Sequence, residues 1–134
     1  LVGLGVSAIS DAGMGYAQNE KTLHDYYNTI AEGKLAVVKG YLLTAEDSNF
    51  RKYILDISCR GKTEFTTEDL ALLKTYSFPY LAELALDGLI NFTETSLEVT
   101  QRGMHFIRNI CYAFDLHVHR KKTESAMPLF SKAI

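Results

Sequence analysis

The first six residues, LVGLGV, are four apolar residues with Gly3 and Gly5 between them, and none of the six is polar. Short apolar runs of this kind are typical of a buried strand, and Gly3 and Gly5 would let another backbone approach it closely. The next few dozen residues hold no partner strand rich in β-branched side chains. We therefore expect a strand cut out of a larger sheet, followed by a loop over residues 10–19, where aspartate, asparagine and glycine favour turns.

Helical spacing begins after this loop. Apolar side chains recur at offsets of three and four over residues 20–30, and Gly33 is placed to cap that helix. Residues 35–43 are expected to form an extended connector. A clearer helix starts after Thr44, a favourable N-cap residue, and ends before Gly61. Its predicted core face consists of Phe50, Tyr53, Ile54 and Ile57.

Two shorter helices and a hairpin follow. Thr66 or Thr67 can cap the first of these helices, and Pro79 suits the first turn of the second, which Gly88 ends. Residues 89–99 place two short apolar segments on either side of a polar turn, which predicts a β-hairpin.

A long closing helix is predicted after Thr100, followed by a polar tail over residues 120–125. The apolar stripe of that helix would be Met104, Ile107, Cys111, Phe114 and Val118, and the chain ends in the apolar cluster Met127, Leu129, Phe130 and Ile134. The predicted fold class is mainly α with a small β-hairpin. Residues 44–134 would be a winged-helix-like domain, and residues 1–43 a strand, loop and connecting helix.

Composition narrows the class of protein. With 134 residues and 47% hydrophobic side chains, the chain is long enough for one core and an appendage. A net charge of −2 gives no general attraction to nucleic acid or to an anionic membrane, and no apolar run approaches the roughly 18 residues of a membrane span. Cys59 and Cys111 are expected to be buried thiols rather than a disulfide, which favours a reducing, cytoplasmic setting.

Several common kinds of site are disfavoured. Residues 3–8 (GLGVSA) match a dinucleotide-binding fingerprint, but that motif needs an immediate helix and a second parallel strand, and turn residues follow instead. A glycine-rich strand end that approaches another ligand stays open. A DNA-reading helix over residues 79–87 would carry Glu83 and Asp87 and no basic residue. No cysteine or histidine spacing suits a metal ion, so no metal ligand is predicted.

The closing helix is predicted to carry a second stripe, opposite the apolar one, that is polar: His105, Arg108, Tyr112, Asp115 and His119. Such a stripe is usually a solvated face. The alternative is a polar wall against another domain or an anionic ligand, with the Arg108 guanidinium as a fork for a carboxylate. Spacing alone leaves both interpretations open.

Several motifs resemble one protein family, in the order in which that family has them. They are GLGVSAIS at 3–10, YAQNEK at 16–21, LTAEDSNFRK at 43–52, LEVTQRGMHFIRNIC at 97–111 and RNICYAFD at 108–115. With them, nearly the whole chain resembles the C-terminal part of oxygen-independent coproporphyrinogen III oxidases. These are radical S-adenosylmethionine enzymes of haem biosynthesis.

The resemblance implies that residues 1 to about 10 are a remnant of the last strand of a catalytic barrel, and that residues 44–134 cap the barrel mouth. The implied reaction is the oxidative decarboxylation of two propionates of coproporphyrinogen III to give protoporphyrinogen IX. The implied cofactors are S-adenosylmethionine and a [4Fe–4S] cluster. The family's three-cysteine cluster motif is missing from this chain, so the fragment alone is expected to be inactive and to bind neither cofactor.

The resemblance also implies site residues. Among the family's cofactor contacts, Ile9 carries over, with Gly5, Ala8 and Ser10 as its neighbours. The best-matched stretch of the closing helix supplies candidates for substrate binding or domain docking, namely Arg108, Asn109, Tyr112 and Asp115. No catalytic residue is assigned, and the implied partner is the missing N-terminal barrel domain. The rival interpretation is a non-catalytic winged-helix domain that binds a partner protein or acts in transcription.

Overall fold

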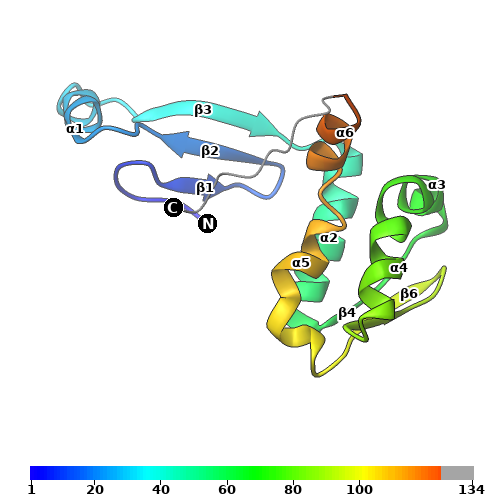
Figure 1. Cartoon of the computed structure of the whole chain (residues 1–134). Coiled ribbons are helices and arrows are strands. Elements are labelled where there is room, and N and C mark those ends of the chain that lie inside the picture. The colour runs from blue at the N-terminus through cyan, green and yellow to red at the C-terminus, as the bar shows by residue number, and fades with distance from the viewer. Residues whose placement is uncertain (125–134) are drawn as a thin grey trace. The chain divides into compact units, whose positions relative to one another are not determined.

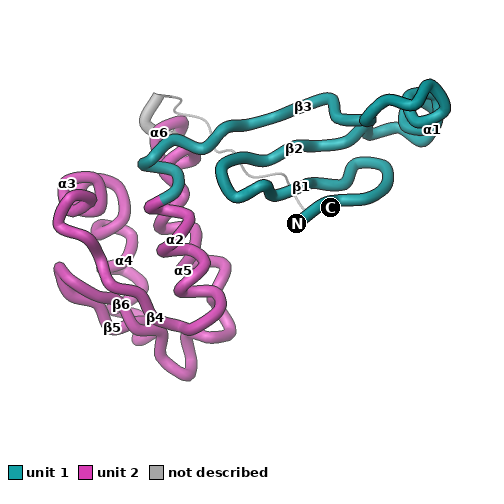
Figure 2. The backbone as a smooth tube through the Cα atoms, turned by 180° about the vertical axis from the view of Figure 1, so that it is seen from behind, with its two compact units in different colours: residues 1–48 teal, residues 49–134 magenta. Residues whose placement is uncertain are grey.

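The computed structural model describes residues 1–124, which divide into two compact units (Figures 1 and 2). Unit 1 is Leu1–Ser48 and unit 2 is Asn49–Ile134. The apolar cluster predicted at residues 127–134 lies outside the described residues. Over the part of the chain that is described, no helix is long and apolar enough to cross a membrane.

Unit 1 is built on a three-stranded antiparallel sheet in the order β1-β2-β3. The strands are β1 (Ile9–Asp11), β2 (Gly15–Asn19) and β3 (Val37–Leu42), and helix α1 (Leu23–Ala31) connects β2 to β3. The loop predicted over residues 10–19 is therefore wrong, since it contains strands. The connector predicted over residues 35–43 is extended as expected, but it also pairs with β2 as a strand of the sheet. The sequence GYAQN of β2 has no β-branched residue, and its ladder comes from neighbouring strands rather than from local propensity.

The predicted N-terminal strand is wrong as well. Residues 1–8 form a loop, in which Leu1 is 89% exposed. Gly5 and Ser7 adopt left-handed conformations, with φ of 98° and 57°, and a strand cannot contain them.

The helix predicted over residues 20–30 is confirmed as α1. Thr22 Oγ1 accepts a hydrogen bond from the Asp25 N–H at its start, and Gly33 follows its end with φ of 71°.

Unit 1 has almost no hydrophobic core. Within residues 1–48, all of which are described, Ala36 is the one buried apolar residue. Helix α1 buries no residue, and its apolar side chains Leu23, Tyr27 and Ile30 are exposed. Hydrogen bonds of the sheet and its loops therefore hold this unit together, because apolar burial contributes little.

Unit 2 contains a helical core and a small sheet. Its elements are α2 (Ala45–Arg60, which begins in unit 1), β4 (Lys62–Glu64), a 3₁₀ turn (Thr67–Asp69), α3 (Leu70–Leu72), a π-helical turn (Leu73–Ser77), α4 (Phe78–Leu86), β5 (Ile90–Phe92), β6 (Ser96–Val99), a second 3₁₀ turn (Gly103–Phe106), α5 (Ile107–Tyr112) and α6 (Leu116–Glu124). The three strands pair in the order β4-β6-β5. The predicted hairpin is confirmed as β5 and β6, whereas β4 was not predicted.

The helix predicted after Thr44 is confirmed as α2. Thr44 Oγ1 accepts a hydrogen bond from the Asp47 N–H at its start, and Gly61 lies just beyond its end with φ of 69°. Its core face buries Phe50, Tyr53 and Ile57, while Ile54 is partly buried. These side chains pack with residues of α4, the sheet and the closing segments, namely Leu81, Leu84, Ile90, Leu97, Ile110 and Phe114.

The prediction of a single closing helix is wrong, because the segment after Thr100 is broken into a 3₁₀ turn, α5 and α6. At the first break, Gly103 lies so close to the Leu89 carbonyl that a Cβ atom would collide with it. At the second, Asp115 Oδ1 accepts a hydrogen bond from the Val118 N–H and starts a new helix. The apolar stripe shifts accordingly. Met104 is exposed, Ile107, Cys111 and Val118 are partly buried, and Phe114 is buried with Ile110, Ala113 and Leu116.

A carboxylate lies inside unit 2 and is fully hydrogen-bonded. Asp69 is 5% exposed, and its Oδ2 accepts hydrogen bonds from the Tyr53 hydroxyl at 2.6 Å and the Thr66 hydroxyl at 2.8 Å. Asn49 Nδ2 donates to Oδ1 at 3.2 Å, and the Thr66 N–H donates to the Tyr53 oxygen at 3.1 Å. The network joins α2 to the segment after β4, because a buried charge must be satisfied where it lies.

We expect Tyr53→Phe to lower the free energy of unfolding of the chain by about 1–3 kcal/mol, since it removes one hydrogen bond from a buried carboxylate. Urea denaturation followed by circular dichroism measures the change. Tyr27→Phe is the matched control, because that side chain is 64% exposed on α1. Equal stability of the two variants would contradict a structural role for the network.

The same network predicts that the free energy of unfolding depends on pH in the alkaline range. Burial, and then the hydrogen bond to Asp69, raise the pKa of Tyr53 above its usual 10.0. The unfolded phenol therefore loses its proton at lower pH than the folded one. The contribution of Tyr53 to stability is fully present below pH 10 and falls as the pH rises beyond it.

Candidate functional site

The loop at residues 1–8 has a backbone that its glycines make possible. A Cβ atom on Gly3 would lie 2.6 Å from the Ile9 carbonyl oxygen, so a side chain there would push the loop away from β1. Gly5 has φ of 98°, which other residues rarely adopt. The close backbone approach that the sequence predicted at Gly3 is therefore present, although the approaching segment is the chain's own strand β1.

Two polar side chains hold this loop. Asn19, at the end of β2 and 9% exposed, donates from Nδ2 to the carbonyl oxygens of Gly5 at 2.9 Å and Gly3 at 3.3 Å. The N–H of Asn19 also donates to the Ala8 carbonyl at 2.9 Å. On β1, Ser10 Oγ accepts a hydrogen bond from the Gly3 N–H at 3.0 Å. The loop is thus clamped through Gly3, whose N–H and C=O are both engaged.

The four predicted cofactor-binding residues lie together at this loop. Ile9 is the first residue of β1 and is 56% exposed, with Ala8 immediately before it. Gly5 lies in the loop and Ser10 clamps it, so the hydroxyl of Ser10 is already engaged in holding the backbone. Asn19 was not among the predicted site residues. It could have been suspected from its place inside the YAQNEK motif.

Ile9 borders a shallow, mostly apolar hollow of about 390 Å³ on one face of the sheet. Tyr16 of β2 and Tyr41 of β3 line the same hollow. The Tyr41 hydroxyl donates to Asp47 Oδ2 at 2.9 Å, and this hydrogen bond raises the pKa of Tyr41. An exposed apolar hollow of this size is suited to a small molecule that other parts of a protein also enclose.

The predicted polar stripe of the closing segment is only partly assembled. Tyr112 ends α5 and His119 lies in α6, and their rings are 5.1 Å apart with His119 Nε2 3.0 Å from the Tyr112 carbonyl. A carbonyl only accepts, so Nε2 donates and carries a proton. Tyr80 of α4 joins these rings, and together they border an open cleft of about 390 Å³ in unit 2.

Arg108 and Asn109 do not join that cluster. Both are exposed on α5, and His105 lies in the preceding 3₁₀ turn. Asp115, which was predicted to lie on the same stripe as Arg108, uses its carboxylate to cap α6. The break between α5 and α6 is the physical reason, since the three-and-four spacing of a single helix does not continue through it.

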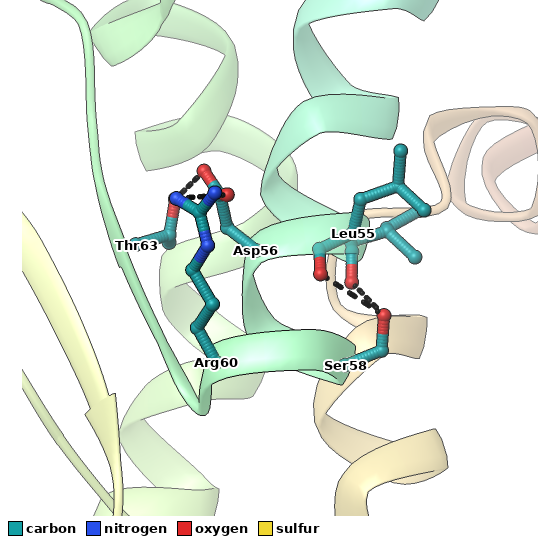
Figure 3. A network of polar contacts seen from close by, with 6 residues as sticks. Leu55, Asp56, Ser58, Arg60 and Thr63 are labelled. Atoms are coloured by element: carbon teal, nitrogen blue, oxygen red, sulfur yellow. Dashed lines mark hydrogen bonds and ion pairs between the residues drawn. The ribbon is translucent and has the colours of Figure 1, made fainter.

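A second polar region of unit 2 was not predicted. It surrounds the C-terminal end of α2, where Arg60 pairs with Asp56 at 3.4 Å and Thr63 Oγ1 lies 3.5 Å from Asp56 Oδ2 (Figure 3). Ser58 Oγ bonds back to the carbonyls of Ile54 and Leu55. The adjoining groove, about 570 Å³, is lined by both signs of charge, including Lys52, Lys62, Glu64 and Glu98. Mixed charge gives this groove no evident preference for an anion or a cation.

The chain's two cysteines are free. Cys59 is exposed, which corrects the prediction that it is buried, and Cys111 is half-buried, where burial raises the pKa of its thiol. Over residues 1–124, no group of three or more histidine, cysteine, aspartate or glutamate side chains is placed to hold a metal ion.

Comparison with known proteins identifies relatives over the full chain. No family model matches. The chain is 36% identical to oxygen-independent coproporphyrinogen III oxidase of Salmonella typhimurium, 36% to that of Escherichia coli and 32% to that of Thermostichus vulcanus, in each case over 100% of its length. It spans 30% of the first two relatives and 42% of the third.

A solved structure gives the same result. Coproporphyrinogen III oxidase from Escherichia coli, described as a radical SAM enzyme, superposes with a TM-score of 0.76 at 36% sequence identity. The match covers 87% of this chain and 28% of that one. The chain is therefore homologous to part of a radical SAM enzyme. More particularly, it is a homologue of the C-terminal part of oxygen-independent coproporphyrinogen III oxidase.

The clamp on the glycine loop can be tested in the chain as it stands. Asn19→Asp keeps the shape of the side chain but replaces the donating amide by an oxygen that faces two carbonyls. We expect the amide hydrogens of Ser7 and Asn19 to exchange about tenfold faster or more, because the hydrogen bonds that order the loop are lost. Hydrogen exchange followed by NMR measures this. Asn28→Asp, on exposed α1, should leave both rates unchanged, and equal rates in the two variants would refute the clamp.

Proposed function

We propose that the chain is the C-terminal part of an oxygen-independent coproporphyrinogen III oxidase, which converts two propionates of coproporphyrinogen III to vinyl groups. Each propionate loses carbon dioxide, one hydrogen atom and one electron. The hydrogen atom would go to the radical derived from S-adenosylmethionine, and the electron to a one-electron acceptor outside this chain. The observation that carries this proposal is the 36% identity over the entire chain, together with a TM-score of 0.76 to such an enzyme. The chain spans only about a third of these relatives, so it supplies part of the machinery.

The proposal assigns unit 1 to the edge of a larger barrel. Its exposed apolar side chains support that assignment, since Ile9, Val38 and Leu42 of the sheet and Leu23 and Tyr27 of α1 bury little surface within the unit. Surfaces of this kind are stable in water when another domain covers them. The N-terminal part that the relatives have in addition is the partner that we propose.

Unit 2 is proposed to cap the barrel mouth with a winged-helix-like domain. The order α2, β4, α3, α4, β5 and β6 supports this architecture, because a helix, a strand, two helices and a hairpin follow one another. The rival interpretation as a DNA-binding winged helix is disfavoured by α4. Its exposed side chains include Glu83 but no lysine or arginine, so it would repel phosphate.

The residues of unit 1 fit a role in binding S-adenosylmethionine. Ile9, Tyr16 and Tyr41 offer an apolar hollow with the dimensions of a small-molecule site, and the clamped loop fixes the backbone at Ala8 and Ile9. When bound, this cofactor supplies the radical that removes hydrogen from the substrate. The three thiolates that would hold the [4Fe–4S] cluster must come from elsewhere in the protein, since this chain has two cysteines.

The role of Ile9 is tested in the full-length protein. Ile9→Asp should raise the dissociation constant of S-adenosylmethionine more than tenfold, because it places an uncompensated charge in an apolar contact. Equilibrium dialysis under anaerobic conditions measures it. Met14→Asp is the control, as Met14 is an exposed apolar residue in the β1–β2 turn. An affinity equal to that of the control would exclude the contact.

Arg108 is proposed to bind a substrate carboxylate or to dock the cap on the barrel. Its guanidinium is exposed on α5, and coproporphyrinogen III carries four propionates. We expect Arg108→Ala to lower kcat/KM by about tenfold or more, and Arg108→Lys to rescue activity only in part, because an ammonium cannot form the bidentate pair. Steady-state kinetics of the full-length protein test this. Arg102→Ala, at another exposed arginine, is the control. If both Arg108 variants turn over substrate like the parent, the proposal is wrong and the polar stripe is only a solvated face.

A further inference from the structure

The register of the unit 1 sheet places two polar side chains in line with Ile9. Ile9 of β1 pairs with Gln18 of β2, and Gln18 pairs with Lys39 of β3. Residues directly opposite one another in antiparallel strands project from the same face of the sheet. Ile9, Gln18 and Lys39 therefore form one row, which we call the Ile9 row. All three residues line the hollow described above.

The two faces of the sheet differ in what they hold. Ser10, which follows Ile9 and so projects from the other face, bonds to Gly3 of the N-terminal loop. Tyr16 and Tyr41, one row further along, are on the same face as Ile9 and give the hollow an aromatic border. The loop is thus attached through the opposite face, and the Ile9 row stays open.

The polar groups around the hollow are not equally available. The Tyr41 hydroxyl donates to Asp47, and Asp11 Oδ1, on the same face, accepts from the Gly13 N–H at 2.8 Å. Gln18 is partly buried and Lys39 is exposed, and neither side chain bonds to any group in residues 1–124. One amide and one ammonium are therefore free to meet a ligand that enters the hollow beside Ile9.

We propose that Lys39 and Gln18 bind the carboxylate of a ligand that enters the hollow beside Ile9. The Lys39 ammonium pairs with the carboxylate, and the Gln18 amide donates a hydrogen bond that fixes its orientation. This inference rests on the proposed function. A carboxylate could come from the methionine part of S-adenosylmethionine or from a propionate of the porphyrinogen, and both have the chemistry that this pair recognises.

The test uses the full-length protein and measures binding rather than turnover. Lys39→Met keeps the length of the side chain without its charge, Lys39→Arg restores a cation, and Gln18→Leu removes the amide at similar volume. S-adenosylmethionine is measured by equilibrium dialysis and coproporphyrin III, the stable oxidised form of the substrate, by fluorescence quenching. Lys34→Met is the matched control, because Lys34 is an exposed lysine of unit 1 that pairs with Glu32 at 2.8 Å.

We expect Lys39→Met to weaken one of the two ligands about tenfold, Lys39→Arg to recover most of the loss, and Lys34→Met to have no effect. The ligand that weakens identifies the source of the carboxylate. If neither affinity changes by more than about twofold while Ile9→Asp still weakens S-adenosylmethionine, this inference is wrong and the proposed function stands. If Ile9→Asp also has no effect, the assignment of the hollow to the cofactor fails as well.

Discussion

The carboxylate of Asp69 lies buried in unit 2 and accepts a hydrogen bond from the Tyr53 hydroxyl. The ring of the same tyrosine lies at the centre of the aromatic core. The Tyr53 ring lies 5.6 Å from Phe50 and Phe65 and 5.9 Å from Phe114. One side chain thus joins α2 to the segment after β4 and to the turn between α5 and α6. A buried charge tolerates few arrangements of its donors, so this hydrogen bond selects one packing among the many that apolar contacts alone would allow.

Unit 1 is organised by a different constraint. It has a ladder of three strands but buries one apolar side chain, so directional hydrogen bonds rather than the hydrophobic effect determine its shape. The Asn19 amide has the same role in unit 1 that the Asp69 carboxylate has in unit 2, because each side chain makes hydrogen bonds to more than one group. The two units therefore differ in what stabilises them. Unit 2 folds around its own hydrophobic core, whereas unit 1 leaves most of its apolar side chains exposed.

Local chemical signals predicted the elements that they control. Thr44, Gly61, Pro79 and Gly88 act within one turn of a helix, and the helix ends that they mark are present. Strand β2 was missed because its partners lie elsewhere in the chain, and the break at Gly103 was missed because it depends on contact with Leu89. The family motif indicated Ile9, but the register that aligns Gln18 and Lys39 with it is a property of the folded sheet.

The exposed apolar face of α1 affects how readily the protein is degraded in a cell. Leu23, Tyr27 and Ile30 lie in water on a helix that buries nothing, which is the kind of surface that chaperones and proteases recognise in unfinished proteins. If the N-terminal domain that we propose covers this face in the full-length protein, a copy without that domain would be degraded early. Degradation would then act as a check on assembly, so that only molecules with both parts in place persist.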